Sequence, residues 1–188
     1  MRTRLLVLAA MPLLAACGTV PPAASGPAPG STTTSEAATK QGFQPLKLGQ
    51  EAGLGCEPGN PASCTVRFAV TAIDVNPACD PYRTPPPAGQ KTVVLHVTMT
   101  TATPGQRERA QAGLLFSARQ LKGVSPDGHI TGVDYGLCLD RPGALSRDIV
   151  PNSKYDGFLE IAVDQTATSI ATSLAGGDPA TGWVWPLG

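Results

Sequence analysis

The chain has 188 residues, of which 21 are Gly and 19 are Pro, while charged residues make up only 15%. Lys and Arg together number 14, as do Asp and Glu, so the concentrated positive charge that nucleic-acid binding requires is missing. The length fits one ordinary domain with an appendage, and the many Gly and Pro residues argue against a helix bundle.

The first 16 residues have the features of an export signal. Arg2 and Arg4 form a positive N-terminal region, and an apolar run follows over residues 5–16. That run is too short for a transmembrane helix, which needs about 20 residues, but it suits the core of a signal peptide. A buried N-terminal helix is the alternative, and Pro12 inside the run argues against it.

The run ends in Leu14-Ala15-Ala16-Cys17-Gly18, which resembles the lipobox of bacterial lipoproteins. The resemblance implies cleavage before Cys17 and attachment of a diacylglyceryl group to its thiol. Two acyl chains would hold the protein stably on the outer face of the cytoplasmic membrane. Residues 17–48 would then be the lipidated cysteine and a tether rich in Pro, Ala, Ser and Thr, which we expect to be disordered because it has little apolar surface to bury.

Residues 49–188 have the alternating pattern of short β-strands. Seven runs, separated by Gly, Pro and Asp, are candidate strands: 65–74, 92–101, 114–121, 129–135, 155–164, 168–174 and 182–185. The side chains expected on the inner face of the first two runs are Val66, Phe68, Val70 and Ala72, followed by Val93, Leu95, Val97 and Met99. A helical turn is expected only within residues 105–115. The pattern predicts an all-β fold, an immunoglobulin-like antiparallel sandwich of about seven strands, with a small closed barrel as the alternative.

This part of the chain also resembles the immunoglobulin-like domain family of Gram-positive lipoproteins and secreted antigens. The resemblance lies in an early strand that ends near Val75-Asn76-Pro77, the long run 93–101, the approach from Pro151 to the strand at 157–159, and a last strand with Trp183. It implies a sandwich fold and no assigned molecular function. Many members carry Asn-Thr or Asn-Gly after the long strand, whereas residues 100–104 of this chain read Thr-Thr-Ala-Thr-Pro. The high usage of Ala, Pro, Gly and Thr is typical of actinobacterial proteins.

Four cysteines remain besides Cys17. An even number behind an export signal predicts two disulfides, for which three connectivities are possible. We favour Cys56–Cys64, because residues 59–61 can turn the chain between them, and Cys79–Cys138, which would tie the loop after the first strand to residues 134–139. A zinc site is not expected, because no two cysteines have the Cys-x-x-Cys spacing of a ligand pair.

No set of residues has the pattern of a catalytic centre. The chain has two histidines, His96, which should point outward from a strand, and His129, which should lie beside a turn. Either could act as a base, but no nucleophile motif accompanies them, and solvated surface histidines are the simpler interpretation. Five aspartates lie in the central half of the body: Asp127, Asp134, Asp140, Asp148 and Asp156. Asp127, Asp140 and Asp156 have turn contexts, which favour structural roles over a calcium site or glycosidase chemistry. We therefore predict no catalytic residue, no metal and no cofactor.

The last strand carries Trp183 and Trp185 on one face. They could form a stacking platform for a sugar or a partner chain, but sealing the core is the favoured interpretation, and Phe158 is a second candidate for a binding surface. The sequence thus predicts a lipid-anchored, non-catalytic module of the cell envelope. It would contact the membrane through the lipid on Cys17 and bind an unknown protein, peptide or cell-wall ligand, and no nucleic acid. The alternatives are an envelope-acting hydrolase, which would use His96 or an Asp pair, and an accessory subunit of an envelope complex.

Overall fold

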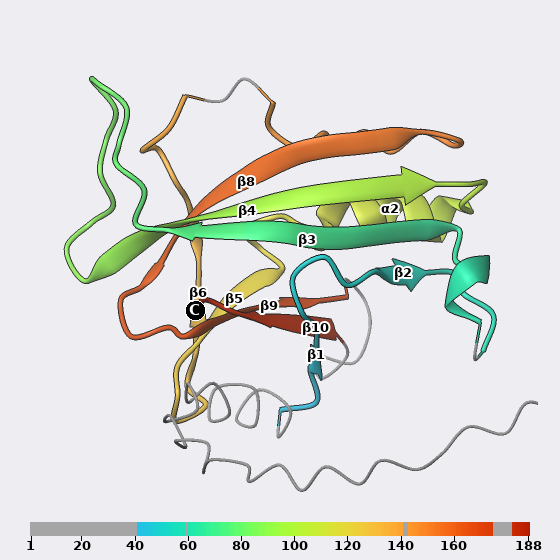
Figure 1. Ribbon diagram of the computed structural model, residues 1–188, viewed down its shortest axis with the longest axis horizontal. Helices are drawn as coiled ribbons and strands as arrows, with labels where there is room; N and C mark the ends of the chain where they lie inside the picture. The colour runs from blue at the N-terminus through green and yellow to red at the C-terminus, as the bar shows by residue number, and fades with distance from the viewer. Residues whose placement is uncertain (1–40, 59, 141–142, 175–181) are drawn as a thin grey trace, which may run out of the picture.

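The computed structural model describes residues 41–58, 60–140, 143–174 and 182–188, and this part of the chain is an all-β sandwich (Figure 1). Sheet A has five strands in the order β1 (Gln44–Pro45), β10 (Gly182–Pro186), β9 (Ser169–Ser173), β5 (Leu121–Val124) and β6 (Ile130–Gly132). Sheet B also has five, in the order β2 (Ala52–Leu54), β3 (Val66–Val75), β4 (Gln90–Thr101), β8 (Lys154–Asp164) and β7 (Asp134–Tyr135). Neighbouring strands are antiparallel, except that β1 runs parallel to β10.

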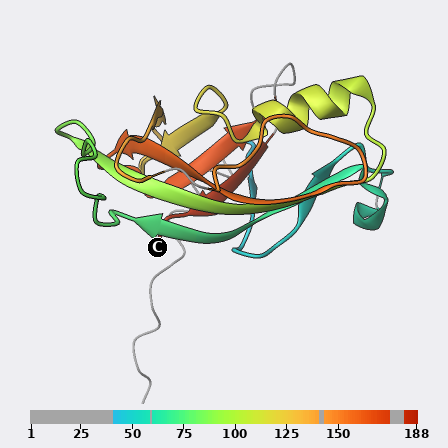
Figure 2. The ribbon, with the colours of Figure 1, turned by 90° about the horizontal axis from the view of Figure 1, so that it is seen from above.

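The described strands form two sheets in two layers with a shared apolar core, so the predicted sandwich is confirmed and these strands do not close into the alternative barrel. Figure 2 shows the long strands β3 and β4 in one layer and β5, β9 and β10 in the other. The largest fully buried side chains come from both sheets and from the helix α2, and they include Trp185, Phe68, Leu95, Leu115, Leu121, Ile161 and Ile170. Among the described residues, no helix is long and apolar enough to cross a membrane.

The inner face of sheet B follows the predicted alternation, except near the end of β3. The four inward residues predicted for β4, Val93, Leu95, Val97 and Met99, are all buried. On β3, however, Val70 pairs with Val97 while Ala72 pairs with His96, so Thr71 forms a bulge. One extra residue reverses the alternation, and the prediction that Ala72 faces the core was therefore wrong. Ile73 packs against the core in its place.

The prediction of a strand over residues 114–121 was wrong. A helix, α2 (Gln106–Leu115), occupies the region where only a turn was expected, and it buries Ala112 and Leu115 in the core. Good helix formers such as Gln, Arg, Glu, Ala and Leu fill this segment. After turns at residues 117–120, β5 begins only at Leu121.

The predicted run 129–135 divides into two strands of different sheets. Its first part is β6 in sheet A, whereas its last two residues are β7 in sheet B. The chain crosses between the layers at the buried residue Val133. The period of two in the sequence could not show this crossing, because apolar and polar residues alternate in the same way in β6 and in β7.

The folded body begins earlier than the predicted boundary at residue 49. Phe43 is only 4% exposed and packs with Val124, Ala171 and Val184, while Leu46 belongs to the main core. Strand β1, which was not predicted, pairs with the last strand of the chain. Residues 41–48 are therefore part of the body and not of the tether. The rest of the predicted tether, the signal peptide and Cys17 lie outside the described residues.

Candidate functional site

The two tryptophans do not form an exposed platform. Trp183 is 9% exposed and Trp185 is fully buried. The ring of Phe68 packs edge-on against Trp183, with 4.9 Å between the ring centres. Both tryptophans therefore complete a core that has few other aromatic side chains, as the favoured interpretation of the sequence had it. The alternative, that they form a binding surface, was wrong.

The candidate site lies instead on the outer face of sheet B, at the end where β3 leads into β4. The loop between these strands projects beyond the sheet, as the green segment of Figure 1 shows. We call residues 80–87 of this loop the arch, and residues 134–140, which run along the edge of β8, the crossing segment. The outward-facing residues Thr92, Val94 and Ala162 are buried at this end of the sheet, whereas the outward positions of β4 and β8 nearer the other end are only half-buried or exposed.

A disulfide and backbone hydrogen bonds join the arch to the crossing segment. Cys79 and Cys138 are bonded across 59 residues of sequence. The backbone N–H of Asp80 donates to the carbonyl of Cys138 at 2.9 Å, and that of Thr84 donates to the carbonyl of Leu137 at 3.0 Å. These contacts hold both segments in one arrangement before any ligand binds.

Charged side chains of the arch also form contacts with the crossing segment. Arg83 forms an ion pair with Asp140, and the backbone N–H of Asp140 donates to Oδ2 of Asp80 at 2.7 Å. Arg83 and Asp140 are exposed and Asp80 is half-buried, so we assign them the role of fixing the arch and not that of a buried reactive group.

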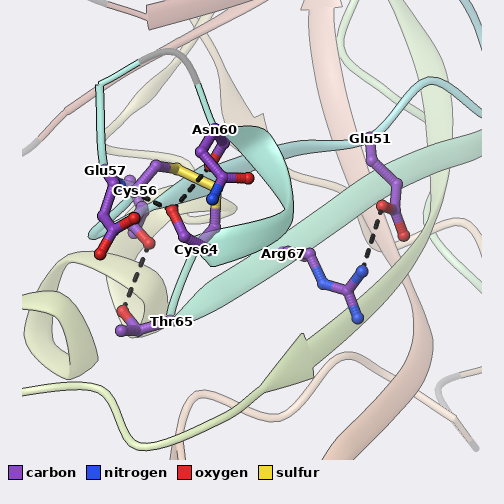
Figure 3. The surroundings of a disulfide bond; sticks show 9 residues. Glu51, Cys56, Glu57, Asn60, Cys64, Thr65 and Arg67 are labelled. Atoms are coloured by element: carbon purple, nitrogen blue, oxygen red, sulfur yellow. Dashed lines mark hydrogen bonds and ion pairs between the residues drawn. A yellow bond between two sulfur atoms is a disulfide. The ribbon is translucent and has the colours of Figure 1, made fainter.

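The second disulfide, Cys56–Cys64, lies at the opposite end of β3, between β2 and β3 (Figure 3). Its pairing, like that of Cys79–Cys138, is the one favoured from the sequence. Ser63 supports the turn between the two cysteines, since its hydroxyl donates to the carbonyl of Asn60 at 2.7 Å and accepts from the backbone N–H of Glu57 at 2.8 Å. The nearby ion pair between Arg67 and Glu51, at 3.6 Å, is exposed. This end of the molecule therefore has the features of a stapled hairpin.

A buried glutamate anchors the crossing segment. Glu160 on β8 is 3% exposed, and its two carboxylate oxygens accept from the backbone N–H groups of Cys138 at 2.5 Å and Leu139 at 3.2 Å. Gly136 passes so close that a Cβ there would collide with this carboxylate. Glu160 was not singled out from the sequence, because a polar residue is expected at an outward position of an alternating strand.

Beneath the arch lies a groove with a volume of about 390 Å³. Its lining residues are Thr84, Pro85, Pro86, Pro87, Thr92, Asp134, Tyr135, Gly136, Leu137 and Ala162. Most of these are apolar, and Leu137 remains 57% exposed. Tyr82 on the arch is fully exposed and has a φ of 68°, a backbone conformation that is uncommon for a bulky residue. Such conformations gather at functional sites, where the surrounding structure holds them in place.

Tyr135 separates the groove from a smaller cavity. The guanidinium of Arg147 lies 5.1 Å from the ring centre of Tyr135 and donates a hydrogen bond to its hydroxyl. The smaller cavity, about 110 Å³, lies between α2, β8 and residues 144–147, and Phe158 is part of its lining. Phe158 is half-buried, and its backbone N–H donates to the carbonyl of Gly143 at 3.1 Å. It therefore does not belong to the surface around the arch.

The two histidines lie apart from the groove. His96 Nε2 is 2.8 Å from Oδ2 of Asp74 on the outer face of sheet B, and the two side chains are 42% and 59% exposed. His129 is exposed in the turn between β5 and β6, where its backbone N–H donates to the hydroxyl of Ser125 at 3.1 Å. Neither histidine lines the groove or the smaller cavity.

The five aspartates singled out from the sequence are not gathered in one place. Asp134 lines the groove, Asp140 fixes the arch, and Asp127 accepts hydrogen bonds from Ser125 and from the backbone of His129 in a turn. The hydrogen bond from Ser125 is the main cause that lowers the pKa of the Asp127 carboxyl. Within the described ranges, no group of three or more His, Cys, Asp or Glu side chains could hold a metal ion.

The residues that form the groove had a partial signal in the sequence. The cluster of prolines after Cys79 indicated a stiff loop, and Tyr135 and Leu137 lie close before Cys138. What could not be read from the sequence is that the disulfide brings these two stretches together over the outer face of a sheet.

No protein-family profile and no curated protein sequence matches this chain. Among solved structures, the chain is similar to MPT63, a secreted protein from Mycobacterium tuberculosis, with 16% sequence identity and a TM-score of 0.39. The alignment covers 75% of this chain and 96% of that chain. The fold assignment given above rests on the strand pairing of the chain itself.

Proposed function

We propose that this protein is an exported, lipid-anchored module of the cell envelope that binds a partner without catalysing a reaction. The export signal and the lipobox resemblance at Cys17 support anchoring at the outer face of the cytoplasmic membrane. Two disulfides in the body fit an oxidising compartment outside the cytoplasm.

The observation that carries the binding proposal is the apolar groove beneath the arch. Its walls are held by the Cys79–Cys138 disulfide and by hydrogen bonds between the arch and the crossing segment. A surface that is already ordered loses less conformational entropy when it binds. Tyr82 and Leu137 add exposed apolar area next to this groove, and tyrosine is among the residues enriched at the energetic centres of protein interfaces.

The non-catalytic part of the proposal is supported by the surroundings of the candidate bases. His96 and its partner Asp74 are both widely open to solvent, and a general base acts best in a site that excludes water and positions a substrate. A Ser or Thr side chain hydrogen-bonded to either histidine ring is not found among the described residues.

The binding proposal can be tested by placing a photo-reactive amino acid at position 82 or 137 in cells that carry the anchored protein. We expect a discrete cross-linked adduct from both positions. Position 114 on α2 is the matched control, because Leu114 is also an exposed apolar side chain but lies outside the groove lining. Equal adducts from all three positions, or none from 82 and 137, would contradict the proposed surface.

The anchoring proposal has a separate test. We expect Cys17→Ser to abolish metabolic labelling of the protein with a fatty acid and to release it from the membrane fraction. Retention of the label in this variant would show that Cys17 is not the lipidated residue.

A further inference from the structure

The groove beneath the arch carries one carboxylate in otherwise uncharged surroundings. Of its ten lining residues, Asp134 on β7 is the only one with a charged side chain. It is exposed and lies opposite Ala162 in the register of β7 and β8. In the part of the chain that the structure describes, its carboxylate has no ion pair and no hydrogen bond.

The other charged groups near the groove already have partners. Arg83 is paired with Asp140, and Asp80 accepts a backbone hydrogen bond. Glu160 is buried with both oxygens bonded to backbone N–H groups. The guanidinium of Arg147 donates to the hydroxyl of Tyr135 and does not belong to the groove lining. Among the lining residues, the Asp134 carboxylate is therefore the charged group that a ligand meets.

A basic group on the β4 side does not neutralise this carboxylate. Lys91 lies next to Thr92, but its ammonium donates to the carbonyl of Ala167 at 2.6 Å and interacts electrostatically with Asp164. The Lys91 side chain thus links β4 to the turn that follows β8. Lys91 is therefore not a partner of the Asp134 carboxylate.

A purely apolar occupant fits this groove poorly. It would cover the prolines, Tyr135 and Leu137, but it would also remove the Asp134 carboxylate from water without a partner, which costs free energy. An occupant with a positive charge beside an apolar body satisfies both parts of the groove. Charge complementarity therefore selects a cationic, amphipathic ligand.

The occupant also has to extend beyond the groove. Leu137 is exposed at the rim of the groove. A backbone hydrogen bond joins Leu137 to Thr84 of the arch, which also carries the exposed Tyr82. A small amine would leave this apolar surface uncovered, whereas an extended polypeptide could cover it while one side chain enters the groove.

From these observations we infer that the groove binds a polypeptide segment in which a Lys or Arg side chain, flanked by apolar residues, pairs with Asp134. This inference rests on the proposed binding function and specifies the partner of the same surface. It requires that affinity depends on one positive charge in the ligand and one negative charge at Asp134.

The test uses the full lipidated protein in detergent micelles and a fluorescein-labelled peptide with the sequence Ala-Leu-Lys-Leu-Ala, measured by fluorescence polarisation. The comparison peptide has norleucine in place of Lys, which keeps the aliphatic chain and removes the ammonium. We expect the norleucine peptide to bind about tenfold more weakly or worse, since a hydrogen bond to a charged group contributes about 1.5–3 kcal/mol.

Variants of the protein separate the charge from the shape of the groove. Asp134→Asn should weaken binding of the Lys peptide about tenfold. It should not weaken binding of the norleucine peptide, because a neutral amide costs less to remove from water than a carboxylate. Asp134→Lys should instead favour a peptide with Glu at the central position. Asp156→Asn is the matched control, because Asp156 is exposed on β8 but does not line the groove. Thermal unfolding of each variant shows whether the body remains folded.

The outcomes distinguish this inference from the proposed function. Equal binding of the Lys and norleucine peptides, binding of neither, or equal effects of Asp134→Asn and Asp156→Asn would overturn the inference. If adducts still form from positions 82 and 137, the proposed binding function stands without it. Lys-selective binding that Asp134→Asn removes supports the inference, and the absence of adducts in cells would then count only against an envelope partner at this surface.

Discussion

The single side chain of Glu160 holds the crossing segment on sheet B. Its buried carboxylate accepts from the backbone N–H groups of Cys138 and Leu139. We expect Glu160→Gln to lower the free energy of unfolding by about 1–3 kcal/mol, because the amide keeps the size of the side chain but presents an N–H group to one of two donors. Chemical denaturation measures this change, with Asp156→Asn as the exposed control on the same strand. Equal stability of the two variants would contradict the anchoring role.

The carboxyl groups of Asp127, which is exposed, and Asp164, which is half-buried, make the stability of the body depend on pH in the acid range. A hydrogen bond from Ser125 lowers the pKa of Asp127, and one from Thr166 lowers the pKa of Asp164, both from the ordinary value of 3.8. Because the folded-state pKa is the lower one, the stabilisation is fully present above pH 3.8 and is lost as the pH falls through the folded-state values. We expect Asp127→Asn and Asp164→Asn to flatten the decline of the unfolding free energy below that pH. Chemical denaturation at a series of pH values from 2 to 6 measures the unfolding free energy. If the slope of this free energy against pH is the same in the double variant as in the unaltered protein, the prediction is refuted.

At the scale of elements, residues 41–48 act as an additional strand segment of the body. Phe43 covers an apolar cluster on sheet A, and β1 pairs with β10, so the start and the end of the body are joined. This arrangement places Gln44 and Pro45, which the sequence had assigned to the end of the tether, directly beside the last strand of the sandwich.

We expect Phe43→Ala to destabilise the protein by about 3–5 kcal/mol, the range observed when a buried Phe is truncated to Ala. Leu48→Ala is the matched control, because Leu48 is exposed, and it should have little effect. Thermal or chemical unfolding measures both. A change for Phe43→Ala as small as that for Leu48→Ala would show that this segment does not contribute to the stability of the body.

At the scale of the whole molecule, the two disulfides staple opposite ends of β3. Loop-closure entropy predicts about 4 kcal/mol from Cys79–Cys138, whose cysteines are 59 residues apart, and about 2.5 kcal/mol from Cys56–Cys64, which are 8 apart. The long-range disulfide also forms the arch, so its loss should affect the binding surface as well as the stability.

We expect the double variant Cys79→Ser/Cys138→Ser to become sensitive to trypsin at Arg83 within the arch, because the segment loses its covalent link to the sheet. The double variant Cys56→Ser/Cys64→Ser should remain resistant at Arg83, since that disulfide lies at the other end of β3. Limited proteolysis with identification of the fragments compares the two. Equal cleavage at Arg83 in both variants would show that the arch does not depend on its own disulfide.

The sequence by itself determined the strands with a clear period of two, the class of the fold and the favoured disulfide pairing. Alternation of apolar residues is a local property, so the long strands β3, β4 and β8 could be recognised from their residues, and so could the burial of Val93, Leu95 and Val97. The lipobox resemblance at Cys17 is likewise local, and it remains a prediction because Cys17 lies outside the described residues.

Only the tertiary structure decided which outward-facing positions are covered. Three features depend on which strands become neighbours: the bulge at Thr71, the crossing at Val133 and the burial of Glu160. The alternation of apolar residues in the sequence does not reveal them, because it has a period of two both before and after each of these positions. The groove arises for the same reason, since Pro85 and Leu137 are far apart in the sequence and meet only because the Cys79–Cys138 disulfide and the sheet bring them together. Pairing between distant segments is a property of the folded chain as a whole, and it placed the candidate site on the arch and not on the tryptophans.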